Sequence, residues 1–168
     1  VGVYGVSREM IGLASVLGLP YILKPLWAPF LDLFRPPLLG GLGRRKGWIL
    51  FFQILLFFIY IGLAHVTPDE NLLILGLLIF LLAFSSASQD IVIDAFRIDY
   101  LSTEAQSYGA STYQLFYRIA MLVMGAGAIW LSDIVEWRLI FFLVAALYLI
   151  IIILTALIPE PKERIERE

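Results

Sequence analysis

The sequence predicts an all-α, polytopic membrane protein with about five transmembrane helices. Hydrophobic residues fill 61% of its 168 positions and charged residues only 15%, whereas soluble domains average about 45–50% and about 25%. The mean hydropathy is correspondingly high, at +0.90. The apolar residues gather in five long segments, and about 20 such residues suffice for a helix to cross the roughly 30 Å hydrocarbon core of a bilayer.

Connectors rich in charged and turn residues separate these segments and set their order along the chain. The predicted spans are residues 10–33, 48–66, 72–96, 109–131 and 139–158. In the first span, Pro20, Pro25 and Pro29 interrupt the helical hydrogen bonds and leave backbone carbonyls that a cavity can use. The second span is the most uniformly apolar of the five.

The last three predicted spans differ in character. The third begins with "LLILGLLIFLLAF" and ends in charged residues. The fourth is rich in small residues, including "GAGA" at positions 125–128, a composition typical of close helix packing in membranes. The fifth contains the purely apolar run "YLIIIILTALI". Each is therefore predicted to be a membrane-spanning helix.

Basic residues in the connectors predict the orientation of the chain. Eight Lys and Arg residues fall on one side of the predicted spans and only two on the other, so the positive-inside rule places the start outside and the tail in the cytoplasm. The eight are Arg35, Arg44, Arg45, Lys46, Arg97, Lys162, Arg164 and Arg167, and the two are Arg8 and Arg138. An outside start, together with a first residue that is Val1 and no signal-peptide pattern, predicts a fragment that lacks one upstream helix.

Several kinds of chemistry lack support in the sequence. There is no cysteine and only one histidine, His65, which argues against thiol catalysis and against Cys- or His-based metal sites. We find no nucleophile–base pair and no cofactor motif, and "GGLGRRKG" lacks the Gly-Lys-Ser/Thr spacing of a phosphate-binding loop. We therefore expect no enzyme activity, no cofactor or metal, and no nucleic acid partner.

The stretch "ASQDIVIDAFRIDYL" places Asp90, Asp94 and Arg97 at i, i+4 and i+7, so that all three share one helical face. At 1.5 Å per residue, Asp90 lies roughly 27 Å from Leu72, near the cytoplasmic end of the span. Two interpretations stay open. One is proton coupling by Asp90 and Asp94, and the other is an ion-paired clamp at the cytoplasmic end, against the Asp32 and Arg44–Arg45 region.

Lys24 and Arg118 are cations predicted to lie deep in the hydrocarbon. Lys24 is roughly 21 Å from Met10 and Arg118 roughly 13 Å from Gly109, and a charge near the bilayer centre costs at least about 2.5–3.5 kcal/mol. Both are candidates for binding an anionic substrate, since Arg in particular grips a carboxylate with two hydrogen bonds. The alternative is that each pairs with Asp90 or Asp94 within the bundle.

Four uncharged polar residues accompany these charges. Tyr113, Gln114 and Tyr117 precede Arg118, and Gln89 precedes Asp90. All four are candidate substrate-binding residues, and the tyrosines and Gln114 suit a sugar. The alternative for the residues around Arg118 is that they form hydrogen bonds between helices.

Four motifs in order resemble the muropeptide permease (AmpG-type) branch of the major facilitator superfamily. They are "LGLPYILKPLWAPFLD", "LGRRKGW", "SASQDIVIDAFR" and "GASTYQLFYRIAMLVMGAGAIWLSD", and the resemblance runs from about Gly12 to Asp133. Asp32 with Gly43, Arg44, Arg45 and Lys46 is similar to the superfamily's signature loop between its second and third helices, and with Arg97 it is the predicted cytoplasmic gate. The sequence departs from that loop at Leu33, where a basic residue is common.

The resemblance implies the second to sixth helices of a twelve-helix transporter. Residues 1–158 are then a partial N-terminal six-helix bundle without its first helix, and residues 159–168 a charged cytoplasmic tail. The implied activity is proton-driven import of anhydro-muropeptides across the bacterial inner membrane, with the proton gradient as energy source. Implied partners are a small glycopeptide substrate, the lipid bilayer and the remainder of the transporter. Alternatives are an acetyl-CoA-type transporter of the same superfamily or a non-transporting permease remnant or membrane scaffold.

Overall fold

A computed structural model describes residues 18–67 and 71–161 of the chain. Residues 10–17 of the first predicted span and residues 162–168 of the predicted tail lie outside the described ranges. Residues 18–23 are helical, and the elements that follow are η1 (Lys24–Leu26), α2 (Ala28–Leu33), η2 (Gly40–Leu42), α3 (Arg44–Leu63), α4 (Leu72–Tyr100), α5 (Gln106–Ser132) and α6 (Trp137–Leu157).

The predicted all-α membrane fold is confirmed, because the described residues form helices and contain no strand. Four of the helices, α3 to α6, are long and apolar enough to cross a bilayer. The boundaries differ in part from those predicted. The helix expected to end near residue 96 continues to Tyr100, so Arg97 lies inside α4 rather than in a connector.

The first predicted span is a broken helix in its described part. The α-helix of residues 18–23 gives way to the 3-10 turn η1, which carries Lys24, and helical structure resumes as α2. Pro25 and Pro29 stand at the first positions of these two elements, where the missing amide hydrogen of proline is tolerated. The described part of the segment is therefore two α-helical stretches separated by the 3-10 turn that carries Lys24.

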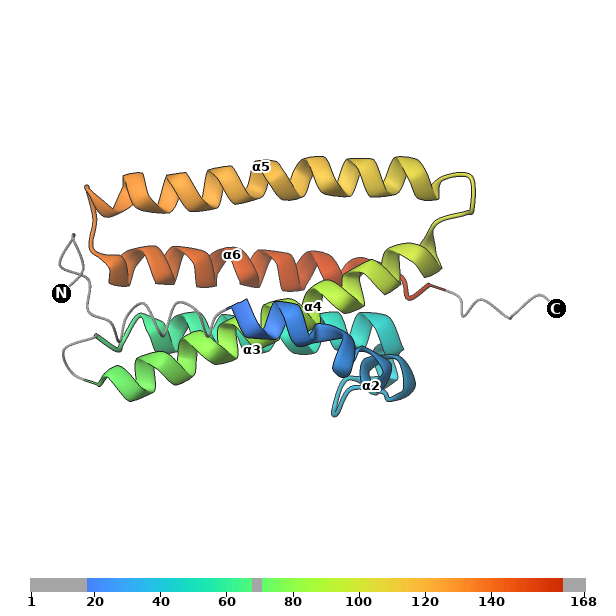
Figure 1. The fold of residues 1–168 in the computed structure, drawn as a ribbon, viewed down its shortest axis with the longest axis horizontal. Helices are drawn as coiled ribbons and strands as arrows, with labels where there is room; N and C mark the ends of the chain where they lie inside the picture. Colours follow the sequence, from blue (N-terminus) through green and yellow to red (C-terminus); the bar gives the residue numbers. More distant parts are fainter. Residues whose placement is uncertain (1–17, 68–70, 162–168) are drawn as a thin grey trace.

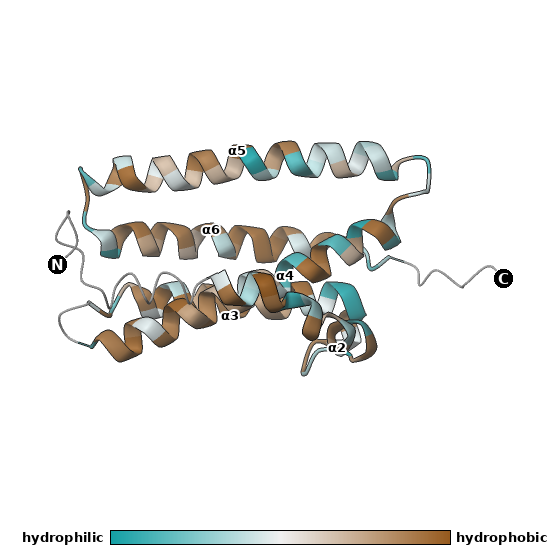
Figure 2. Cartoon of the chain, viewed as in Figure 1, coloured by the Kyte–Doolittle hydropathy of each residue, from teal (hydrophilic) through white to brown (hydrophobic). Residues whose placement is uncertain are grey.

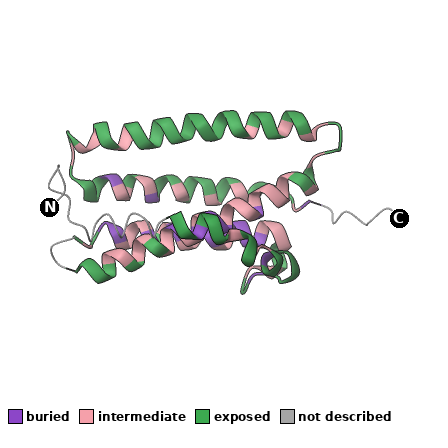
Figure 3. Cartoon of the chain, viewed as in Figure 1, coloured by how far each residue is buried: buried purple, intermediate pink, exposed green. Residues whose placement is uncertain are grey.

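Helix α3 is the centre of the fold. It packs closely against α4 on one side and α6 on the other, and Figure 3 shows that buried positions gather along it. At the end where α3 begins, α2 covers it and adds Leu31 to a cluster of buried side chains. The cluster comprises Leu31, Trp48, Ile49, Phe52 and Val92.

Small residues let α4 approach its neighbours closely. The buried positions of α4 are Ala83, Ser85, Ala87, Ser88 and Val92, a pattern that favours close backbone contact between membrane helices. The indole nitrogen of Trp27 donates to the Ser88 hydroxyl over 3.0 Å. This bond ties the broken first segment to the middle of α4.

Helix α5 is much less enclosed than the others. It lies beyond α6 from α3 (Figure 1), its second half is largely apolar (Figure 2), and none of its residues is buried. A side chain added at Gly125 or Gly127 would meet no atom of the described residues. The close packing predicted for "GAGA" is thus not made with any described part of the chain.

One glycine is required by close packing near the start of α3. A Cβ built on Gly47 would lie 2.7 Å from both the Leu39 carbonyl oxygen and the Pro36 ring. We predict that Gly47→Ala lowers the thermal unfolding temperature in detergent, since the loop must shift to accommodate the methyl group. Ordinarily Gly→Ala inside a helix stabilises by roughly 0.5–1 kcal/mol.

The matched control is Gly41→Ala in the same loop, because a Cβ there meets nothing within 4 Å. The two variants are compared by tryptophan fluorescence during heating. Equal unfolding temperatures for Gly47→Ala and Gly41→Ala would contradict the packing described here.

Candidate functional site

The charged residues of the chain gather at the end of the bundle where α3 begins and α4 ends (Figure 2). Arg45, whose side chain is only 12% exposed, forms ion pairs with Asp32 of α2 and with Asp99 of α4, the latter at 2.9 Å. A guanidinium group presents several donors in a fixed plane, so one side chain can hold two carboxylates. Arg45 thereby connects three elements.

Glu160, which follows α6, caps the N-terminus of α3. Its two carboxylate oxygens accept hydrogen bonds from the backbone amides of Arg45 and Lys46, each at 2.8 Å. A carboxylate at a helix N-terminus satisfies free amides and interacts favourably with the helix dipole. Gly43 makes room for it: its φ is +111°, and a side chain there would overlap the Glu160 carboxylate.

Two further basic residues complete this end of the bundle. Arg44 donates to the backbone carbonyl of Asp32 over 2.6 Å, and the ammonium of Lys46 donates to the carbonyl of Ala156 near the end of α6 over 2.7 Å. The predicted signature loop, Asp32 with Gly43–Lys46, is thus brought together. We call the group Asp32, Arg44, Arg45, Lys46, Asp99 and Glu160 the charged knot.

Sequence reasoning missed Asp99 and Glu160. Asp94 and Arg97, which it singled out as the α4 side of a clamp, instead pair with one another at 3.6 Å, one helical turn apart. Asp99 was hidden because the predicted span ended at residue 96. The signal for Glu160 was an acidic residue directly after the last apolar run, in a stretch interpreted only as a charged tail.

Asp90 lies in the interior part of α4 and is half-buried. The charged groups that act on it most strongly are Lys24, which is attractive, and Asp94, which is repulsive. Lys24 makes no ion pair within 4 Å with any described residue, so the interaction acts across a longer distance. The 3-10 turn of the broken first segment therefore presents its cation towards the carboxylate of α4.

Tyr113 and Tyr117 of α5 lie opposite this part of α4. Their rings stack with centroids 6.3 Å apart, and Tyr113 interacts electrostatically with Asp90, Asp94 and Arg97. Gln89 has a buried carbonyl oxygen without a hydrogen-bond partner among the described residues. The structure thus places Lys24, Asp90 and the α5 tyrosines in one neighbourhood.

Arg118 and Gln114 are on the same helix as these tyrosines but are exposed. Arg118 forms no ion pair with a described residue, so neither predicted partner, Asp90 nor Asp94, holds it. Because α5 has no buried residue, no element of the described chain encloses the Arg118 side chain. Its role in substrate binding stays a prediction.

The sequence profile of the Major Facilitator Superfamily matches residues 2–168. The chain belongs to this superfamily. The predicted family is thereby confirmed, and the long apolar helices of the described residues are those of a multi-pass membrane protein. Members of the superfamily are built from helix repeats that rock around a central site.

Several proteins resemble this superfamily member over most of its length. It is 40% identical to the anhydromuropeptide permease of Escherichia coli (strain K12) over 97% of the chain and 33% of that protein. It is 35% identical to the putative transporter AmpG 4 of Rickettsia conorii over 87% of the chain and 36% of that protein. The chain therefore spans about a third of the length of the relatives it matches.

The cap on α3 leads to a prediction about stability. Glu160→Gln removes the charge that faces two α3 amides and the helix dipole. We expect a loss of about 1 kcal/mol, within the roughly 0.5–2 kcal/mol range for lost N-caps, seen as a lower unfolding temperature in detergent. Glu136→Gln is the control, since Glu136 precedes α6 without a side-chain capping bond. A larger loss for Glu136→Gln would refute the assignment.

Proposed function

We propose that this chain is part of a proton-coupled secondary transporter that imports anhydromuropeptides, which are glycopeptides. The relatives named as a permease and as AmpG transporters support the substrate class. The observation that carries the proposal is the position of Asp90, half-buried in a membrane helix and acted on by Lys24 and Asp94. Ionisable residues inside membrane spans typically belong to substrate or proton pathways.

Proton binding and substrate binding are linked because one cation, Lys24, attracts two carboxylates, that of Asp90 and one of the substrate. A glycopeptide carries peptide carboxylates, and Lys24 is the attractive charge acting on ionised Asp90. When Asp90 takes up a proton, its attraction to Lys24 is lost, and Lys24 becomes free to bind a substrate carboxylate. When Asp90 releases the proton to solvent, its carboxylate again competes with the substrate carboxylate for Lys24, which favours release of the substrate. Asp94, one turn further along α4, is the proposed second proton-coupling group.

The polar residues of α5 complete the proposed substrate site. The electrostatic interaction of Tyr113 with Asp90 and with Tyr117 supports this, as does the carbonyl oxygen of Gln89, which has no hydrogen-bond partner among the described residues. Gln114 and Arg118 belong to the proposal because of their place in the same helix. Arg118 is the proposed second contact for a substrate carboxylate, when parts of the transporter outside the described residues close over α5.

The charged knot is the proposed cytoplasmic gate. Its basic residues, with Arg97 nearby, give this end of the bundle the excess positive charge expected on the cytoplasmic side. The chain then enters from the periplasm, ends in the cytoplasm, and lies in the bacterial inner membrane. The remaining partners are the lipid bilayer and the rest of the transporter, including one helix before this piece and a second bundle after it.

The proton-coupling role of Asp90 is tested with Asp90→Asn in the full transporter. An amide cannot carry the proton, so we expect uptake driven by a proton gradient to fall at least about tenfold, a change equivalent to about 1.4 kcal/mol. Exchange of labelled for unlabelled substrate without a gradient should persist, because it requires no net proton movement. Both are measured in membrane vesicles with labelled anhydromuropeptide.

Asp133→Asn is the matched control, because Asp133 is an exposed carboxylate at the far end of α5. It should leave both measurements unchanged. Gradient-driven uptake that is intact in Asp90→Asn would exclude Asp90 from coupling. Loss of both uptake and exchange would assign it a structural role instead.

The role of Lys24 gives a separate prediction. Lys24→Gln should raise the KM for a carboxylate-bearing substrate about tenfold, as expected when a charged hydrogen bond worth about 1.5–3 kcal/mol is weakened. The maximal rate should change much less. Lys24→Arg, which keeps the charge, should recover most of the affinity. Equal KM values for Lys24→Gln and the unmodified protein would remove Lys24 from the substrate site.

A further inference from the structure

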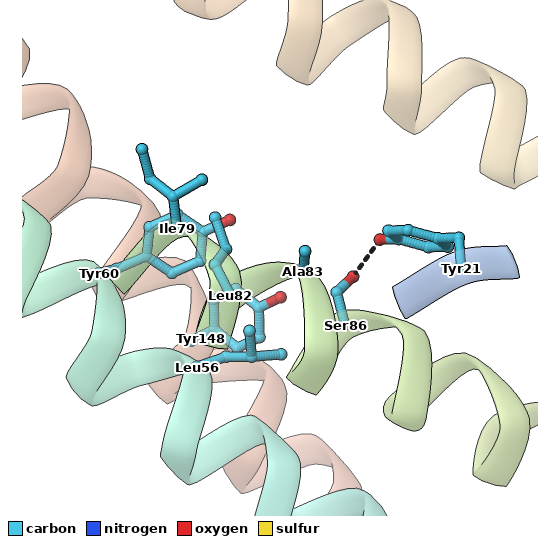
Figure 4. A pocket seen from close by; sticks show the side chains of 8 residues that line it. All are labelled: Tyr21, Leu56, Tyr60, Ile79, Leu82, Ala83, Ser86 and Tyr148. Atoms are coloured by element: carbon cyan, nitrogen blue, oxygen red, sulfur yellow. Dashed lines mark hydrogen bonds between the residues drawn. The ribbon is translucent and has the colours of Figure 1, made fainter. Parts of the chain in front are cut away.

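A cavity lined by four hydroxyl groups lies between the broken first segment and helices α3, α4 and α6. Its volume is about 270 Å³, slightly below the roughly 300–1,000 Å³ of sites for drug-sized ligands. Figure 4 shows the rings of Tyr60 and Tyr148 together at one end and Tyr21 with Ser86 at the other. The lining residues are Tyr21, Leu56, Tyr60, Ile79, Leu82, Ala83, Ser86 and Tyr148.

The cavity carries hydroxyl groups with unused hydrogen-bonding capacity. Tyr21 donates to the Ser86 hydroxyl over 2.9 Å, while the hydroxyls of Tyr60 and Tyr148 make no hydrogen bond with any described residue. The two rings lie 5.5 Å apart, tilted by 33°. Both hydroxyls border the cavity and can each donate and accept a hydrogen bond, so they are available to a polar occupant at this end.

Two tyrosines that line this cavity interact electrostatically with Asp90 of the proposed transport site. Tyr148 interacts with Tyr60, Tyr21 and Asp90, and Tyr21 interacts with both Asp90 and Tyr117. Tyr21 also belongs to the segment that carries Lys24 on its next turn. Tyr21 lines the cavity and precedes Lys24 by three residues, so one side of the cavity and the Lys24 cation belong to the same short segment.

The chemistry of the lining selects the kind of group that fits. Tyrosine presents a flat apolar face and a hydroxyl that both donates and accepts, which matches the C–H face and the hydroxyl rim of a sugar ring. A second cavity, between α5 and α6, is larger at about 410 Å³ but is lined by aliphatic side chains, methionine and small residues. That cavity offers no hydroxyl to orient a sugar.

We propose that the cavity formed by Tyr21, Tyr60, Ser86 and Tyr148 binds one six-membered sugar ring of the transported glycopeptide. This inference rests on the proposed function and deepens it. The peptide carboxylate lies at Lys24, and the sugar lies beyond Tyr21 between α3, α4 and α6. The α5 residues Tyr113, Gln114 and Tyr117 then serve the part of the substrate nearer to Asp90, not this ring.

The test uses the full transporter with Tyr60→Phe, Tyr148→Phe and the double variant, because each change removes only a hydroxyl. Binding of the free anhydro-disaccharide is measured by tryptophan fluorescence on purified protein. Each single variant should weaken this binding roughly three- to tenfold, as expected for one lost hydrogen bond. The isolated peptide should compete for uptake of labelled anhydromuropeptide equally well in all variants.

Tyr108→Phe is the control, since Tyr108 is 80% exposed near the start of α5, and its disaccharide affinity should be unchanged. Unaltered disaccharide affinity in the double variant, or no binding to the unmodified protein, overturns the inference. An equal loss for disaccharide and peptide also overturns it, because the hydroxyls would then serve helix packing or a trapped water. Hydroxyl-dependent disaccharide binding without gradient-driven uptake would instead uphold the cavity and reject the proposed transport function.

Discussion

Arg45 holds one end of this structure together. Its guanidinium bridges carboxylates of α2 and α4, and its backbone amide is bound by Glu160 from beyond α6. Three other segments of the chain therefore converge on one residue with little exposure to solvent. Such a buried charge is favourable only when its partners are all present, so the relative positions of these segments are mutually dependent.

The architecture was predictable from the sequence because hydrocarbon imposes a simple rule. Helices are the only structures that satisfy their own backbone without water and without closing into a barrel, so long apolar runs fix where α3 to α6 lie. The ends were less predictable. Helix α4 continues to Tyr100, and its last turn carries Asp99, which pairs with Arg45 in a tertiary contact that no local pattern records.

The sequence predicted which kinds of residue belong to the candidate site, but only part of how these residues are arranged in space. Charges in a membrane span stand out in a sequence, so Lys24, Asp90 and Arg118 were found without coordinates. Their grouping depends on helix rotation and on neighbours: Lys24 and Asp90 interact, while Arg118 lies on a helix that the described chain leaves uncovered. The hydroxyls of Tyr60 and Tyr148 escaped notice because single tyrosines in apolar runs resemble ordinary packing residues.

The prolines of the first segment separate two mechanical tasks. Pro25 and Pro29 lack the amide hydrogens that would continue a regular helix, so two of the bonds that resist bending are absent around Lys24. The half bearing Asp32 is anchored by Arg45, whereas Tyr21, in the preceding half, is hydrogen-bonded to Ser86 of α4. A bend at this break would move Tyr21 and Lys24 relative to Asp32, whose position is fixed by Arg45.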